Sequence, residues 1–298
     1  MRLEEGRTGD KGVTGDRRVD AMIIGAMKCG TTTLADQLKA HPEVAFCRRK
    51  EPEFFSKNTD WRKGLDGYHA LFDGVPGRVR MEASTGLTFY PFFNRGIWKD
   101  LYEYNPDLRF IYLVRDPIDR VISHYMHIRE RGFTDLPIDE ALRTIGLMLN
   151  VTRYHAQVSP YIETFGRDQV LILLFEDLVK DRERTLGKVA SHLGIDPTLF
   201  PPQQRHSNRS VGGRKHLHRF DAPPFWAKAI MKLAPARFKD LIWQRIAYDP
   251  SRSFSSRPEL ASEWREAVVR MLRSDIEALE RLLDRDLSAW YAADRWMG

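Results

Sequence analysis

The sequence is poor in cysteine and has no long apolar run. Its two cysteines, Cys29 and Cys47, exclude a small disulfide-stapled scaffold, and neither has the spacing of a zinc ligand. No apolar stretch is long enough to cross a bilayer, and residues 1–18 lack the apolar core of a signal peptide. We therefore expect residues 1–18 to form a loose polar tail and the protein to lie in a reducing, cytoplasmic compartment.

Internal repeats, low-complexity tracts and clustered metal ligands are also missing. The histidines His206, His216 and His218 do not have the spacing of a metal site, so we expect no metal. What is present, 42% hydrophobic and 30% charged residues in 298, is typical of a globular protein with a substantial core.

Positive charge is concentrated in one part of the chain. The net charge is +6, yet residues 205–245 alone hold ten basic residues against two acidic ones. Such a segment favours anionic ligands. Within it, residues 225–243 interleave aromatic and aliphatic residues with lysine and arginine, which is typical of core-packing helices or of a basic amphipathic lid for a lipid-linked or acidic acceptor.

Continuous apolar segments alternate with helical patterns along most of the chain. This alternation predicts an α/β fold with a P-loop-like parallel sheet covered by helices on both faces, in a single domain over 19–298 with a basic loop and helical lid at about 201–247. The expected strands are 21–25, 44–46, 79–84, 108–114 and 169–175, and the main expected helices are 31–40, a helix from Pro117, 180–193 and 258–283. Residues 60–77 and 132–153 are expected to be variable loops that build an acceptor pocket, with a helix or turn-rich stretch over 61–72.

The first strand leads into a loop bounded by Gly25 and Gly30. Glycines let successive backbone N–H groups converge on one anion, and the helix behind them adds the positive end of its dipole. Lys28 adds a full charge inside this loop. The common GxxxxGK[ST] pattern instead has its lysine after the second glycine, where this chain has Thr31, and no separate magnesium-binding acid is evident. The pattern predicts a phosphate ligand held by protein charges alone.

A second strand-to-helix junction carries Arg115 and Ser123. The strand ends in the arginine, Pro117 starts the helix, and the serine lies about two turns in, so both side chains can face the carboxyl edge of the sheet. Ligands bind at that edge in open α/β folds.

These two motifs resemble those of sulfotransferases that use 3′-phosphoadenosine-5′-phosphosulfate (PAPS), in particular the heparan-type and bacterial carbohydrate branch. The resemblance implies that Arg115 and Ser123 hold the 3′-phosphate of PAPS, and of the product adenosine 3′,5′-bisphosphate (PAP). It extends through Phe175-Glu176-Asp177-Leu178 to Leu287-Ser288-Ala289-Trp290. The residues that it implies for the 5′-phosphosulfate are Lys28, Cys29, Gly30, Thr31, Thr32 and Thr33.

The acceptor hydroxyl must lose its proton during transfer, so a base must reach it. In the heparan-type enzymes a glutamate just before a Phe-Phe pair does this, and Glu51 stands at the matching position, with Glu53 as its rival. The cytosolic branch instead uses a histidine after a later strand, and residues 82–85 contain none. Heparan-type enzymes also have a lysine where this chain has Ala83, which argues against a polyanionic glycan acceptor.

The late loop 205–215 resembles the family's basic loop over the nucleotide. Arg209, Arg214 and Lys215 are its candidates for contacting the 3′-phosphate, without a choice among them. The resemblance implies sulfuryl transfer to a hydroxyl of a carbohydrate, lipid-linked molecule or small metabolite, with peripheral membrane contact as an option and no nucleic-acid partner. A nucleotide kinase and a non-catalytic nucleotide- or polyanion-binding module are the alternatives.

Overall fold

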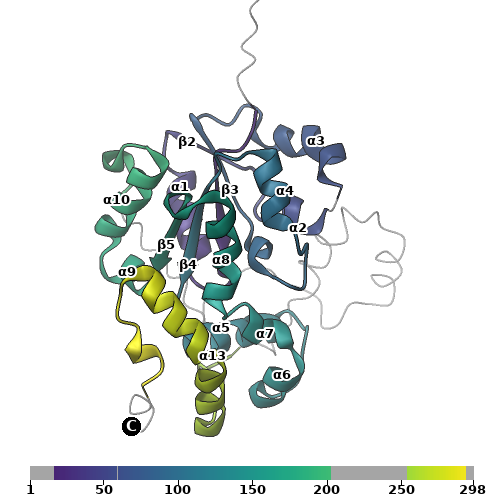
Figure 1. Cartoon of the computed structure of the whole chain (residues 1–298), viewed down its shortest axis with the longest axis vertical. Helices are drawn as coiled ribbons and strands as arrows, with labels where there is room; N and C mark the ends of the chain where they lie inside the picture. The colour runs from purple at the N-terminus through teal and green to yellow at the C-terminus, as the bar shows by residue number, and fades with distance from the viewer. Residues whose placement is uncertain (1–16, 59, 203–253, 293–298) are drawn as a thin grey trace, which may run out of the picture.

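A parallel β-sheet forms the centre of the molecule. The structure is a computed structural model that describes residues 17–58, 60–202 and 254–292 (Figure 1). The sheet has five strands in the order β2-β3-β1-β4-β5, and every neighbouring pair is parallel. The strands are Ala21–Gly25 (β1), Val44–Phe46 (β2), Val79–Ala83 (β3), Arg109–Val114 (β4) and Val170–Leu174 (β5).

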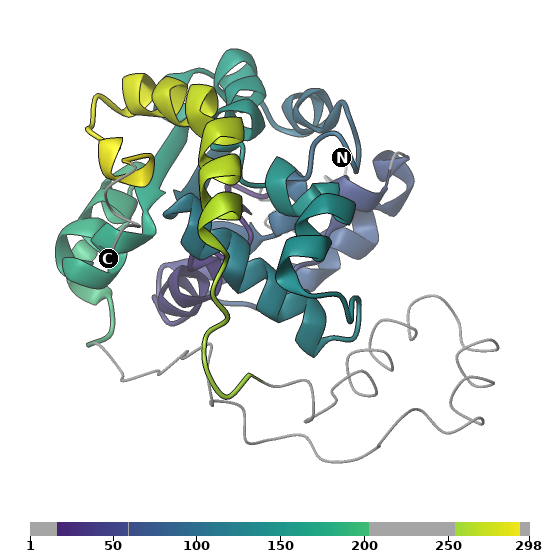
Figure 2. The same ribbon diagram turned by 90° about the horizontal axis from the view of Figure 1, so that it is seen from below.

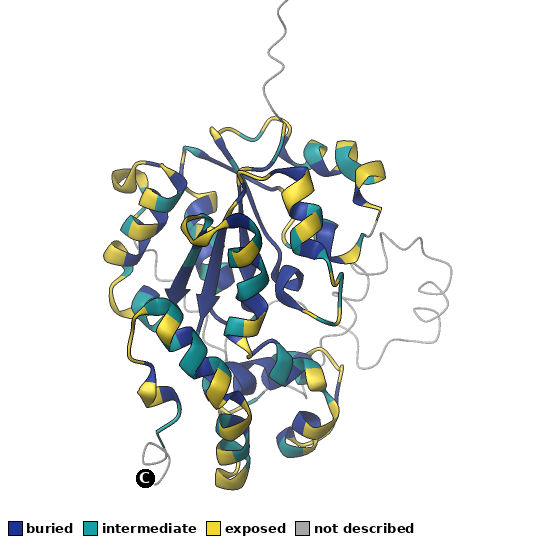
Figure 3. Ribbon diagram, in the orientation of Figure 1, coloured by how far each residue is buried: buried dark blue, intermediate teal, exposed yellow. Residues whose placement is uncertain are grey.

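Burial explains why the sequence predicts these strands so closely. All five residues of β1 are buried, and in β4 only the first residue, Arg109, is exposed. Figure 3 shows the strands at the centre of the molecule in the dark blue of buried residues. Strands covered on both faces are apolar without alternation, so their ends are visible in the sequence as the points where apolar residues stop. The predicted strands therefore match the observed ones to within one residue at either end.

Helices cover both faces of the sheet, as predicted (Figure 1). Helices α1 and α10 pack on one face, where the Arg182 guanidinium donates to the side chain of Gln37. On the other face Phe110 of β4 packs against Tyr161 and Phe165 of α8. The bounds of these elements are Thr31–Lys39 (α1), Ile97–Tyr104 (α4), Tyr154–Phe165 (α8), Phe175–Lys180 (α9), Arg182–Leu193 (α10) and Ser262–Leu283 (α13).

The remaining helices pack beside the elements already described and beside one another. They are Phe54–Lys57 (α2), Leu65–His69 (α3), Pro117–Glu130 (α5), Ile138–Thr144 (α6) and Gly146–Asn150 (α7). Helix α13 packs against α8 and α5, which Figure 2 shows from below. The prediction of a loop over 132–153 is wrong in part, because α6 and α7 bury Ile138, Leu142 and Met148 there. These helices are so short that the spacing of their few apolar residues does not distinguish them from a loop in the sequence.

Several predictions fall outside the described residues. These are Arg209, Arg214 and Lys215, the basic segment 225–243, and almost all of the tail 1–18. Within the described ranges, no helix has both the length and the apolar character needed to span a membrane.

Candidate active site

The loop after β1 is shaped by two glycines that cannot be replaced without a clash. A Cβ on Gly25 would lie 2.2 Å from the hydroxyl oxygen of Thr88, which donates to the carbonyl of Ile24 at 2.7 Å. Gly30 has φ 88°, in the left-handed region, and a Cβ there would lie 2.5 Å from the ring of Phe175. The loop therefore lies in close contact with the elements on either side of it.

Helix α1 begins directly after this loop, so its positive end faces the space that the loop surrounds. Lys28 precedes it with φ 73°, a left-handed conformation that is uncommon outside glycine. Thr31 is buried, whereas Thr32 and Thr33 are half-buried at the first helical turn, and this turn contains no acidic residue. An anionic ligand suits this place, because the helix N-terminus and Lys28 are positive and the first turn of α1 has no carboxylate.

Cys29 supports the loop from within. Its thiol is fully buried 3.6 Å from the hydroxyl of Tyr154, and burial raises the pKa of the thiol to about 12. Its backbone N–H donates to the carbonyl of Ala26 at 3.1 Å. The thiol and the backbone N–H of Cys29 thus have partners inside the protein, and the thiol remains uncharged at neutral pH.

The second junction joins β4 to α5, and α5 begins at Pro117 as predicted. The side chain of Asp116 caps the helix by accepting the N–H of Asp119 at 2.9 Å, and the N–H of Asp116 donates to Glu176 at 2.9 Å. The Arg115 guanidinium lies over the ring of Phe175, 4.8 Å from its centroid, and 3.3 Å from Asp119. Its orientation is therefore fixed from two sides.

The two junctions lie at the same edge of the sheet. Strands β1 and β4 are parallel neighbours, so their carboxyl ends lie at the same edge of the sheet. Neighbouring strands are about 5 Å apart. The ring of Phe175 contacts Gly30 on one junction and Arg115 on the other. Tyr154 also joins them, because its hydroxyl donates to the carbonyl of Arg115 at 2.8 Å and lies beside Cys29.

Neither Phe175 nor Tyr154 was singled out from the sequence as a contact between the junctions. Phe175 stands in the Phe-Glu-Asp-Leu motif after β5, and that position was the available signal. Ser123 lies about two turns into α5 on its buried side. Arg257, which precedes α13, pairs with Asp119 and so brings the last part of the chain to this junction.

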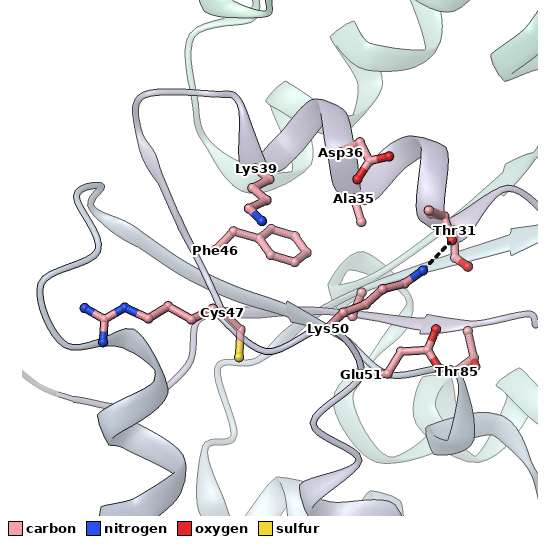
Figure 4. A pocket seen from close by; sticks show the side chains of 12 residues that line it. Thr31, Ala35, Asp36, Lys39, Phe46, Cys47, Lys50, Glu51 and Thr85 are labelled. Atoms are coloured by element: carbon pink, nitrogen blue, oxygen red, sulfur yellow. Dashed lines mark hydrogen bonds between the residues drawn. The ribbon is translucent and has the colours of Figure 1, made fainter. Parts of the chain in front are cut away.

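Glu51 lies on a pocket beside α1. The chain there follows β2 and has φ 48° at Glu51. Figure 4 shows Glu51 beside Thr85, with Lys50 extended toward the start of α1, where its ammonium group bonds the hydroxyl of Thr32 at 3.2 Å. The pocket thus places a carboxylate next to the first turn of the helix that follows the glycine loop.

Glu53, the rival base, has a different environment. One of its carboxylate oxygens accepts the N–H of Gly86 at 3.0 Å, and the other accepts the hydroxyl of Ser56. Burial raises the pKa of Glu53 despite these bonds. Its carboxylate is occupied in holding α2 against the turn after β3, and it does not line the pocket that contains Glu51.

Glu82, at the end of β3, is a buried carboxyl that the sequence did not identify as unusual. Tyr68 donates to it at 2.8 Å and Ser84 at 2.6 Å, yet burial is the larger influence and raises its pKa to about 7. The ordinary value for this side chain is 4.5, so the folded protein holds the proton more tightly than the unfolded chain does.

We expect the unfolding free energy to fall as the pH rises from about 4.5 to 7, by up to about 3 kcal/mol from this group. Over that window the unfolded state loses its proton first, so deprotonation favours unfolding. Glu82→Gln should flatten the dependence, and urea denaturation at pH 5 and pH 8 measures it. Glu163→Gln, an exposed substitution on α8, is the control; an equal pH dependence in Glu82→Gln and the wild type would contradict the assignment.

Together, the fold and this edge define a class of protein: a parallel α/β domain with a site suited to an anionic, nucleotide-like ligand at the switch point between β1 and β4. The comparisons with known proteins identify the family. The sequence model of one protein family, the sulfotransferase domain, matches residues 18–210, well over half of the chain. The chain belongs to the PAPS-dependent sulfotransferase family, which confirms the resemblance seen in the sequence.

Individual relatives agree with this family. The chain is 31% identical over 186 residues to human heparan sulfate glucosamine 3-O-sulfotransferase 3B1, covering 59% of this chain and 46% of that protein. It is 25% identical to human carbohydrate sulfotransferase 15, over 79% of this chain and 52% of that protein. The chain thus spans about half the length of these curated relatives.

A solved bacterial structure is similar over its whole length. The sulfotransferase from Alicyclobacillus acidocaldarius superposes with a TM-score of 0.64 at 26% identity, covering 92% of this chain and 99% of that one. The fold is therefore that of sulfotransferases. No group of three or more histidine, cysteine, aspartate or glutamate side chains suited to a metal occurs in the described part of the chain.

Proposed function

We propose that this protein transfers the sulfuryl group of PAPS to a hydroxyl of a carbohydrate acceptor. The observation that carries the proposal is the meeting of the two strand-to-helix junctions at one sheet edge, with Arg115 and Gly30 on the same Phe175 ring. One adenine nucleotide has two anionic ends, and neighbouring parallel strands place a site for each within its reach.

The chain offers a fitting group for each end of the donor. Residues 26–30 and the start of α1 would hold the 5′-phosphosulfate, because the loop has no room for side chains at its glycines and adds the charge of Lys28. Arg115 would hold the 3′-phosphate, with Ser123 beside it on α5. The Nε atom of Arg115 is buried and has no partner in the described structure, so it adds a donor for an anion.

PAPS supplies an activated sulfuryl group. The acceptor hydroxyl gives its proton to the carboxylate of Glu51, its oxygen forms a new bond to sulfur, and the bond from sulfur to the phosphate oxygen breaks to leave PAP. Lys28 and the loop N–H groups stabilise the charge that develops on the departing phosphate. In this mechanism Glu51 takes the proton of the acceptor hydroxyl, and Lys28 with the loop N–H groups balances the negative charge on the leaving phosphate.

The acceptor class is inferred from relatives and from the pocket at Glu51. Two relatives are named as sulfotransferases that act on heparan sulfate glucosamine and on carbohydrate, and the pocket lining is rich in hydroxyl and charged side chains. A sugar offers the matching hydroxyls. A lipid-linked acceptor and a small metabolite are the other two classes to include in an acceptor screen, and a cytoplasmic location remains part of the proposal.

Binding of PAP and turnover of PAPS test the function together. We expect calorimetry to show PAP binding by the wild type, and Arg115→Met to weaken it about 10- to 100-fold, as for loss of a charged hydrogen bond. Arg273→Met on the exposed face of α13 is the control.

Radiolabelled PAPS with a panel of sugars, lipid-linked sugars and small alcohols then measures transfer. Magnesium-dependent ATP turnover without sulfuryl transfer would favour the kinase alternative. PAP binding without transfer to any acceptor would favour a binding module.

A further inference from the structure

Arg120 is a completely buried arginine beneath the glycine loop. Its side chain has no exposed surface, and burial lowers the pKa of its guanidinium. Its partners in the described structure are the carbonyls of Met27 and Met148 and the ring of His124, and no carboxylate is among them. A buried charge without an opposite charge is costly, so the position calls for an explanation.

One contact of Arg120 acts on the loop itself. Its Nη1 atom donates to the carbonyl oxygen of Met27 at 3.4 Å. In a planar trans peptide the C=O and the following N–H point in opposite directions. A Met27 carbonyl turned toward Arg120 therefore turns the N–H of Lys28 away from Arg120. Lys28 has the left-handed φ of 73°, and this contact helps to hold it there.

The other contacts tie Arg120 to α7 and to its own helix. Its Nη2 atom donates to the carbonyl of Met148 and lies 3.2 Å from Nδ1 of His124. Burial and the nearby Arg120 charge keep the pKa of His124 well below its usual value. A neutral imidazole can accept a hydrogen bond at Nδ1, so His124 fits as an acceptor for the guanidinium.

We propose that Arg120 is a positioning residue for the donor: it holds the Met27–Lys28 peptide with its N–H toward the anion site, and its buried charge is balanced by the donor's phosphosulfate. The proposal rests on the function proposed above. Arg120 also links α7, which packs next to α5, to the donor loop, because it bonds the carbonyl of Met148 as well as that of Met27.

Two substitutions separate the charge from the hydrogen bonds. Arg120→Met removes both while keeping most of the side-chain volume. Arg120→Lys keeps a charge, but its single ammonium nitrogen cannot occupy the positions of both Nη1 and Nη2. The control is Arg182→Met, which removes a half-buried arginine that bonds the side chain of Gln37 and the carbonyl of Pro201. Gln37 lies at the end of α1 that is farther from the glycine loop.

PAP affinity by calorimetry is the decisive measurement, at low and at moderate salt. We expect Arg120→Met to lower the affinity at least tenfold and to make its salt dependence shallower, whereas Arg182→Met lowers the unfolding free energy with PAP affinity unchanged. Arg120→Lys should retain the salt dependence with an intermediate affinity. If Arg120→Met does not fold, the Lys variant alone decides, since an unchanged affinity there would contradict positioning through the hydrogen bonds.

The outcomes distinguish the two proposals. A wild type that does not bind PAP overturns the proposed function. A wild type that binds PAP together with a folded Arg120→Met protein that binds it equally well overturns the role of Arg120 alone.

Discussion

Lys28→Ala should lower turnover about 100- to 1,000-fold at saturating PAPS, the usual effect of removing one group that stabilises charge in a transition state. Lys28 stands in the loop between β1 and α1, and the mechanism proposed above places there the phosphate of PAPS that gains charge as its bond to sulfur breaks. Alanine and lysine meet the same steric cost at φ 73°, so the substitution changes the charge and leaves the backbone preference the same.

Steady-state rates with varied PAPS and a fixed acceptor check this prediction. Lys188→Ala, on the exposed side of α10, removes the same charge far from the sheet edge and should leave turnover unchanged. Near-normal turnover of Lys28→Ala at saturating donor would mean that another group carries the phosphate charge.

Glu51→Gln should lower turnover about 100- to 10,000-fold, the range for loss of a general base, with PAP affinity within about twofold of the wild type. Glutamine has nearly the same shape as glutamate but cannot accept the acceptor's proton. The pocket beside Thr32 and Thr85 should still form, because the Glu51 carboxylate makes no hydrogen bond to another described residue that a glutamine would lose.

Glu53→Gln provides the matched comparison. The Glu53 carboxylate bonds Gly86 and Ser56, so its substitution should lower the unfolding free energy by about 1 kcal/mol, as for an imperfectly replaced hydrogen bond. The rate per folded molecule should change little. Single-turnover rates and urea denaturation of both variants check the pair. A fully active Glu51→Gln beside an inactive, folded Glu53→Gln would assign the base to Glu53 instead.

Local signals were strong enough for most of the fold. The apolar strands, the glycine-bounded loop and Pro117 at the start of α5 could all be located from neighbouring residues, because burial on both faces and the demands of a helix start act over a few positions. Helix α8 had no such signal: Pro160 lies inside it, and it was not predicted. Packing of Tyr161 and Phe165 on Phe110 of β4 stabilises this helix despite the proline.

The sequence by itself determined the parallel α/β class, the family, and the residue types at the two strand-to-helix junctions, since these depend on short motifs of fixed chemistry. Only the tertiary structure decided which distant groups meet: Phe175 between Gly30 and Arg115, Tyr154 between Cys29 and Arg115, Glu53 on Gly86, and Arg120 under Met27. Such contacts join residues far apart in the chain, and strand order and side-chain packing bring them together after the local pattern has been fixed.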